Sequence, residues 1–227
     1  MFDPTIITPT LAKLNALAGG LFLLTAFALV ATRQVLACLR IYIGQSLLLA
    51  FSAFLLGVLH GSVHLFVVAA ITLVIKSALI PWLLRRTVGH DIYARREISQ
   101  ILNVPASLLI AVAIAIFAHA VATPLLAVSV GPYERINLPI GMAGLFLGAY
   151  TVTVRREAIP QLIGILAMES GAFFAGVSIA PGLPLIAELA AAFDVLIIAL
   201  VMGLLTRKIH EHIGTTAVGE MTSLREE

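Results

Sequence analysis

Two carboxylates lie near the middle of the last two long apolar runs of the chain. Glu169 lies about 18 Å along a helix from Arg156 and Glu157. Asp194 lies about 20 Å from Arg207 on the same estimate, so both acids share one depth if these flanks lie on one side of a membrane. A charge at that depth costs about 2.5–3.5 kcal/mol and by default marks a proton or ion path. The alternative is a structural carboxylate that bonds a neighbouring helix.

Lys76 is a third ionisable residue inside an apolar run, about 14 Å from Arg85. Its own run contains no acidic residue, so the lysine must reach toward the interface, pair across helices or lose its proton. Reaching the interface over so many residues is awkward, and we therefore expect an interhelical partner or an altered protonation. The alternative is a plain salt bridge. Pro81 has no N–H to donate, so we expect the helix that carries Lys76 to bend near it.

Three further polar residues lie within apolar runs. Gln45 lies about 18 Å from Arg33, at a depth that matches the carboxylates. Glu188 lies one turn into its run and could either pass protons outward or contact headgroup water. His119 fits a hydrogen-bonded packing histidine better than a proton relay.

The composition excludes a soluble domain. Hydrophobic residues make up 60% of the 227 residues and charged residues only 11%, whereas soluble domains are about 25% charged. The sequence has no glycine-rich phosphate loop and no nucleophile motif. His210 and His212 are two residues apart and do not share a helix face, so we expect no metal site. We expect a lipid bilayer as the surroundings, no bound cofactor and no nucleic acid.

The apolar runs predict an all-α integral membrane protein with about seven transmembrane helices. The predicted spans are 9–32, 35–59, 62–84, 104–128, 137–154, 158–180 and 183–206. The connections 60–61 and 181–182 are tight, so each should join the two helices beside it into a hairpin.

The distribution of lysine and arginine predicts the orientation. With the amino terminus outside, only Lys13 and Arg135 face the outside. The inner face then holds Arg33, Arg40, Arg85, Arg86, Arg95, Arg96, Arg155, Arg156, Arg207, Lys208 and Arg225. Because basic residues gather on the cytoplasmic side, we expect the amino terminus outside and the carboxyl terminus in the cytoplasm.

In this orientation the first three predicted helices and the last three cross the membrane in the same order of directions. Parallel-repeat transporters are arranged in this way. The single membrane domain, 1–227, would divide into a first repeat at 9–84, a connector helix at 104–128, a second repeat at 137–208 and a cytoplasmic tail at 209–227. Similar sequences end the third helix of each set, LLRR at 83–86 and LTRK at 205–208.

The sequences ILAMESG at 165–171 and LLTRKI at 204–209, with Asp194 between them, resemble hydrogenase-4 component E. HIGT at 212–215 and Leu224 extend a likeness that covers nearly the whole chain. That family occurs with group 4 hydrogenases and related membrane assemblies akin to respiratory complex I. The resemblance implies that partner subunits, and not this chain, hold the iron–sulfur clusters and, in hydrogenases, nickel–iron.

The second repeat is also similar to the K subunit of complex I, called C in Mrp antiporters. That subunit carries one membrane glutamate on its second helix and another on its third. The resemblance puts the first at Glu169 and the second at Asp194, where this chain has the shorter acid. In the first repeat the corresponding places hold Gln45 and, more loosely, Lys76. The resemblance implies a hydrophilic axis between a redox module and antiporter-like subunits.

We therefore expect a subunit of a complex I-like, hydrogenase-related complex in the bacterial inner (cell) membrane, with no catalytic residue of its own. Glu169 and Asp194 would pass protons laterally through bound water, with Lys76 as their charge partner. The expected partners are antiporter-like and other membrane subunits together with peripheral cytoplasmic redox subunits. Two alternatives remain open, a passive structural scaffold and a free-standing secondary transporter.

Overall fold

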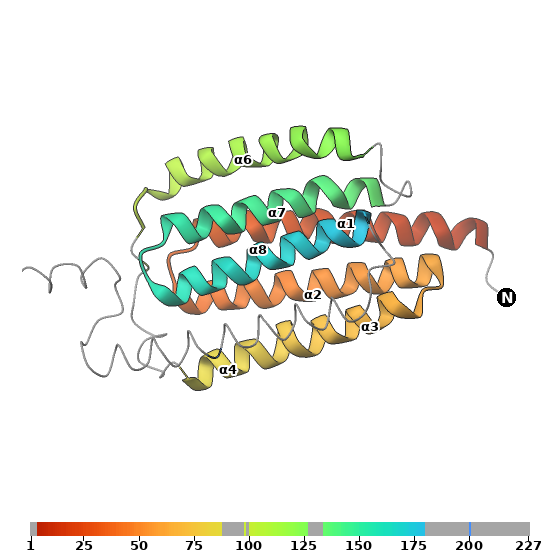
Figure 1. The fold of residues 1–227 in the computed structure, drawn as a ribbon, viewed down its shortest axis with the longest axis horizontal. Coiled ribbons are helices and arrows are strands. Elements are labelled where there is room, and N and C mark those ends of the chain that lie inside the picture. The colour runs from red at the N-terminus through yellow and green to blue at the C-terminus, as the bar shows by residue number, and fades with distance from the viewer. Residues whose placement is uncertain (1–3, 88–97, 99, 127–133, 180–199, 201–227) are drawn as a thin grey trace, which may run out of the picture.

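The computed structural model describes residues 4–87, 98, 100–126, 134–179 and 200, and within these ranges it contains helices and no strand. The main elements are α1 (Pro4–Ala31), α2 (Val35–His60), α3 (Val63–Ile71), η1 (Thr72–Leu79), α4 (Ile80–Thr87), α6 (Val104–Leu125), α7 (Glu134–Val154) and α8 (Ala158–Ile179). Figure 1 shows the helices side by side, with α6 at one edge and the rod formed by α3, η1 and α4 at the other.

Six helical stretches of the described part are long and apolar enough to cross a membrane. They are Thr8–Ala31, Val35–His60, Val63–Arg86, Val104–Leu125, Arg135–Val154 and Ala158–Val177. Their bounds agree within a few residues with the first six predicted spans, so the all-α membrane fold is confirmed. The span predicted at 183–206 and the tail at 209–227 lie outside the described residues, and the division into two parallel repeats stays a prediction.

Gly61 makes the tight turn that joins α2 to α3. Its φ of 62° lies in the left-handed region that other residues rarely adopt, and the N–H of this cap position donates to the Gly57 carbonyl. The predicted hairpin between these two helices is therefore present.

The rod that carries Lys76 is not a regular α-helix. Over η1 it is a π-helix, and the Ile80 N–H donates to the Ile75 carbonyl, five residues back. Pro81 follows directly and has no N–H to offer the preceding turn. The irregularity expected near Pro81 therefore takes the form of a widened turn just before the proline. Wide turns of this kind are frequent at functional sites.

Glycines bring α7 and α8 into backbone contact. A Cβ added at Gly171 would lie 2.2 Å from the Leu145 nitrogen, and one at Gly148 would lie 2.4 Å from the Met168 nitrogen. Small residues allow such an approach between membrane helices, which pack by van der Waals contact. At 100° per residue Glu169 lies about 130° around α8 from this contact face. The close packing therefore turns the Glu169 side chain away from α7.

Candidate functional site

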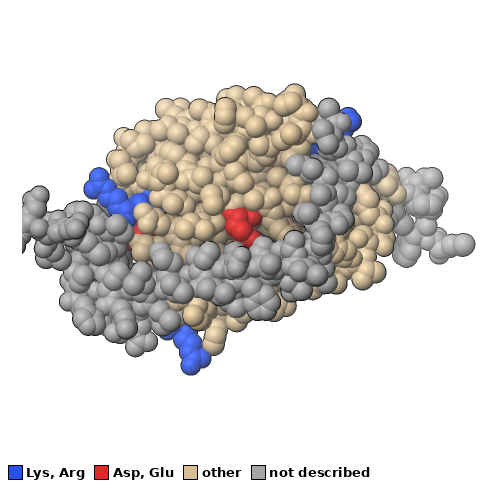
Figure 2. Space-filling view, viewed as in Figure 1, with Lys and Arg blue, Asp and Glu red and all other residues tan. Residues whose placement is uncertain are grey.

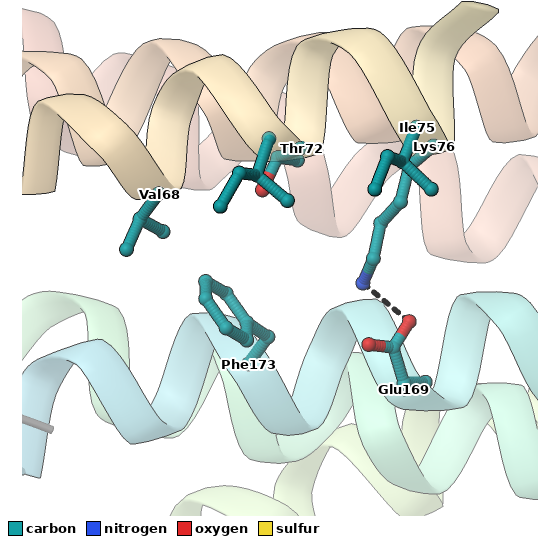
Figure 3. Close-up of a pocket in the computed structure, with 7 residues that line it drawn as sticks. Val68, Thr72, Ile75, Lys76, Glu169 and Phe173 are labelled. Carbon is teal, nitrogen blue, oxygen red and sulfur yellow. Dashed lines mark hydrogen bonds and ion pairs between the residues drawn. The ribbon is translucent and has the colours of Figure 1, made fainter. Parts of the chain in front are cut away.

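Lys76 and Glu169 form an ion pair in the interior of the bundle. The Lys76 ammonium donates a hydrogen bond to the Glu169 carboxylate, and so joins η1 to α8 across 93 residues of sequence. Figure 3 shows the two side chains pointing toward each other from facing helices. Lys76 thus has the interhelical partner that its position required.

The two partners are buried to different degrees. The Lys76 side chain is 5% exposed, whereas the Glu169 side chain is 21% exposed. In Figure 2 acidic atoms are visible near the centre of the view, within an uncharged part of the described surface. The carboxylate is therefore the more accessible end of the pair, and the lysine is the end enclosed by protein.

Apolar side chains and one hydroxyl surround the pair. A cavity of about 10 Å³ lies beside it, lined by Val68, Ile71, Thr72, Ile75 and Phe173 together with the two charged residues. The Lys76 Nζ also lies 5.4 Å from the centre of the Phe173 ring, within reach of a cation–π interaction. A space of this size has room for about one water molecule.

This arrangement can store and exchange one proton. In apolar surroundings the ammonium and the carboxylate stabilise each other's charge, and either one alone would be costly. If a proton moves from Lys76 Nζ to a Glu169 oxygen, an N–H bond breaks, an O–H bond forms and both groups become neutral. The protonation of one group is therefore tied to that of the other.

Gln45 lies in the same part of the bundle. It is completely buried on α2, and α2 packs against both η1 and α8. Its amide makes no hydrogen bond to any described residue. Asp194 and Glu188 lie outside the described residues, so the structure does not place them.

His119 is apart from this group. Its side chain is exposed on α6, and the described contacts of α6 are with α1 and α7. Figure 1 places α6 at the edge of the bundle opposite η1. The structure therefore does not bring His119 together with Lys76 and Glu169.

Sequence reasoning missed a buried polar cluster made by Asn15, Ser52 and Asn137. Asn15 Nδ2 donates to Asn137 Oδ1 at 3.1 Å, and Ser52 Oγ donates to Asn15 Oδ1 at 2.6 Å. Asn137 Nδ2 completes the ring with contacts of 3.3 Å to Ser52 Oγ and 3.4 Å to Asn15 Oδ1. The cluster joins α1, α2 and α7. Its members are neutral and far apart in sequence. The available sequence signal was the presence of an asparagine within an apolar run.

Replacing Asn137 with leucine is expected to destabilise the three-helix junction by about 1–3 kcal/mol, because it leaves Asn15 and Ser52 buried with fewer partners. Thermal unfolding of the full chain in lipid measures the loss. Thr153→Val is the matched control, since Thr153 is exposed and its hydroxyl donates to the Tyr150 carbonyl of its own helix. Equal stability of Asn137→Leu and the unchanged protein would show that the cluster contributes nothing.

Arg155 also has a role beyond its contribution to the orientation signal. It is 2% exposed, and its Nη2 donates to the carbonyls of Leu29 at 2.8 Å and Thr32 at 2.6 Å. These carbonyls close the carboxyl-terminal end of α1, where a cation is favourable. Arg155 therefore fixes the turn between α7 and α8 to the end of α1.

The spans and the buried ion pair define a multi-pass all-α membrane protein with a charged pair in its interior. The chain is 31% identical over 210 residues to an uncharacterized protein of Mycobacterium tuberculosis, covering 92% of this chain and 94% of that one. It is 28% identical over 218 residues to hydrogenase-4 component E of Escherichia coli K12, and to that of Shigella flexneri, covering 93% of this chain and 96% of each relative. The chain is a homologue of hydrogenase-4 component E over nearly its whole length. No family model and no solved structure matches it.

Proposed function

We propose that this chain is a membrane-arm subunit of a hydrogenase-4-type, complex I-like assembly, and that its Lys76–Glu169 pair takes part in moving protons. The alignment with hydrogenase-4 component E over 93% of the chain supports membership of such a complex. The observation that carries the proton role is the ion pair itself, which joins two membrane helices in the bundle interior. Ionisable residues inside membrane spans are rare and mark proton or ion pathways.

The proposed cycle starts from the ionised pair. A proton taken up from the aqueous phase, delivered as hydronium, binds the more exposed Glu169 carboxylate, which becomes neutral and no longer balances the Lys76 ammonium. The ammonium then gives a proton to the next acceptor, for which we propose Asp194, and a proton from Glu169 restores Lys76. One proton enters and one leaves, so the pair returns to its starting state.

The remaining candidates have supporting roles in this proposal. Gln45 would hold water beside the pair, and Glu188 would exchange protons with the outer side. His119 is exposed on α6, so it would exchange protons only with a neighbouring subunit. The driving force would come from partner subunits that hold iron–sulfur clusters and nickel–iron, and this chain would bind neither.

The proposed setting is the bacterial inner membrane, with the amino terminus outside and the carboxyl terminus in the cytoplasm. The basic residues at the ends of the spans support this orientation. Neighbours in the membrane would be antiporter-like subunits, and a peripheral redox module would bind on the cytoplasmic side. The predicted parallel repeats would give the chain two similar three-helix units along the membrane arm.

Replacing Glu169 with glutamine in the assembled complex tests the proton role. The amide can still accept a hydrogen bond from Lys76 but cannot take up a proton, so we expect assembly to continue and proton translocation to fall at least tenfold per complex. A pH-sensitive dye in inverted membrane vesicles measures translocation during hydrogenase turnover, and a native gel measures the amount of complex.

Glu169→Asp is the matched control, because it keeps the acid with a shorter side chain and should retain part of the activity. Unimpaired pumping by Glu169→Gln would exclude the proton role. Under the scaffold alternative, the glutamine variant would change stability without changing turnover. Under the transporter alternative, the purified chain alone in liposomes would carry out ion exchange.

A further inference from the structure

The inner face of α2 carries three polar side chains that are completely buried. Tyr42, Gln45 and Ser46 each have no exposed surface. Their spacing of three and four residues places them on one face of the helix, over little more than one turn. Leucines precede and follow them on the same face, at Leu39 and Leu49. The polar group is therefore a local feature of an otherwise apolar surface.

The polar atoms of this group make no hydrogen bond within the described part of the chain. They are the Tyr42 hydroxyl, both amide atoms of Gln45 and the Ser46 hydroxyl. The Tyr42 and Ser46 hydroxyls are near enough to interact with each other, so the Gln45 amide is the member of the group that has no partner of either kind among the described residues. Buried polar groups in proteins almost always have partners, and a cluster without them points to ordered water or another ligand.

Other buried hydroxyls of this protein are satisfied locally. Ser170 Oγ donates to the Leu166 carbonyl at 2.9 Å, and Thr151 Oγ1 donates to the Leu147 carbonyl at 2.8 Å, each four residues back along its helix. Ser46 has the same option toward the Tyr42 carbonyl and does not use it. The Ser46 hydroxyl is therefore not satisfied by its own helix backbone.

The chemistry of the group favours water as its ligand. Hydroxyl and amide groups both donate and accept hydrogen bonds, as water does. A metal ion would require carboxylates or several carbonyl oxygens, and an anion would require a cationic donor. Two to four polar partners are what a buried water molecule needs.

The position of the group connects it to the ion pair. Tyr42 packs in one buried cluster with Leu166 and Ala167 of α8 and with Ile75 of η1, and α2 packs against both helices that carry the pair. The cavity beside Lys76 and Glu169 has room for about one more water molecule. Water held by α2 would therefore lie next to the proton-exchanging groups.

We infer that Tyr42, Gln45 and Ser46 form an internal water site on α2 that adjoins the Lys76–Glu169 pair. The water site depends only on these buried groups, while its use as a proton relay rests on the proposed function. Tyr42 and Ser46 are then positioning residues for water, in addition to the Gln45 that the sequence indicated.

A density map of the full-length chain in lipid nanodiscs, with the subunits that co-purify, tests the inference at a resolution that shows ordered water. We expect at least one water molecule within hydrogen-bonding distance of two of the three side chains. Direct pairing of these atoms with another side chain, or a dry site, would overturn the inference.

Thermal unfolding of Gln45→Met and Ser46→Ala gives a second readout. If the site holds water, removing its ligands should lower the midpoint, whereas removing an unpaired polar group from a dry core should raise it. Ser170→Ala is the matched control, because Ser170 is an equally buried helix serine whose partner is its own backbone. A higher midpoint in both variants would count against the water site.

These readouts do not involve proton pumping. A hydrated α2 together with normal pumping by Glu169→Gln would keep the water site and exclude the proton role. A dry α2 together with lost pumping would exclude the water site and keep the proton role.

Discussion

Replacing Lys76 alone with methionine is expected to destabilise the protein, but by less than the about 3–5 kcal/mol lost when a fully buried pair loses one partner, because the carboxylate left behind is 21% exposed. The Lys76 side chain is 5% exposed, and its ammonium is the described partner of the Glu169 carboxylate. Methionine fills a similar volume but offers neither a charge nor a donor. The carboxylate then remains among Phe173, Ile75 and Val68 without compensation.

Replacing both partners, Lys76 with methionine and Glu169 with glutamine, is expected to restore most of the lost stability. Neutral side chains of similar size often replace a buried ion pair without net cost. Thermal unfolding is measured for the unchanged protein, the two single variants and the double variant. The four stabilities give the coupling energy between Lys76 and Glu169 directly. Lys13→Met is the control for the substitution itself, because Lys13 is exposed on α1. Additive single effects would mean that the two charges do not stabilise each other.

The double variant also separates the proton role from a scaffold role. If the pair only fixes helix packing, the restored protein should support normal translocation in its complex. If the pair exchanges protons, the restored protein should assemble and still fail to translocate. The combination of restored stability and absent pumping is the result we expect.

The positions of the membrane spans were predictable because length and hydropathy alone determine them. A run of about 20 apolar residues bounded by basic residues has few alternatives to a transmembrane helix. The bounds of α2 and α8 accordingly match the predicted 35–59 and 158–180 closely. The need of Lys76 for a partner was predictable too, since a lysine at that depth has few stable states.

What the sequence could not supply is the rotation of each helix about its axis. The ring of Asn15, Ser52 and Asn137 exists because three helices turn these neutral side chains toward one point. Near η1 the sequence predicted a bend at Pro81, but not that it would take the form of a π-helix just before the proline. Hydropathy indicates which segments enter the membrane, but it says little about which faces of the helices contact each other.

The same limit applies to Tyr42 and Ser46. Both are residue types that occur within many membrane helices, and only their complete burial gives them a role. The structure uses Gly171 for close approach to α7.

Replacing Gly171 with alanine is expected to separate α7 from α8 and to destabilise the protein by about 3 kcal/mol, the upper end of the usual cost of overpacking. The added Cβ would lie 2.2 Å from the Leu145 nitrogen and 2.5 Å from the Gly144 carbonyl carbon. Both are backbone atoms, so no side-chain rotation relieves the clash. Gly148→Ala should behave alike, since its Cβ would lie 2.4 Å from the Met168 nitrogen.

Gly44→Ala is the matched control for this prediction. An added Cβ at Gly44 meets no described atom within 4 Å, and alanine is the better helix former by about 1 kcal/mol. We therefore expect Gly44→Ala to unfold at or above the midpoint of the unchanged protein, while Gly171→Ala unfolds well below it. Equal midpoints for the two variants would mean that α7 and α8 can separate without cost. Because α8 carries Glu169, the separation should also weaken its contact with Lys76 and lower proton translocation per assembled complex.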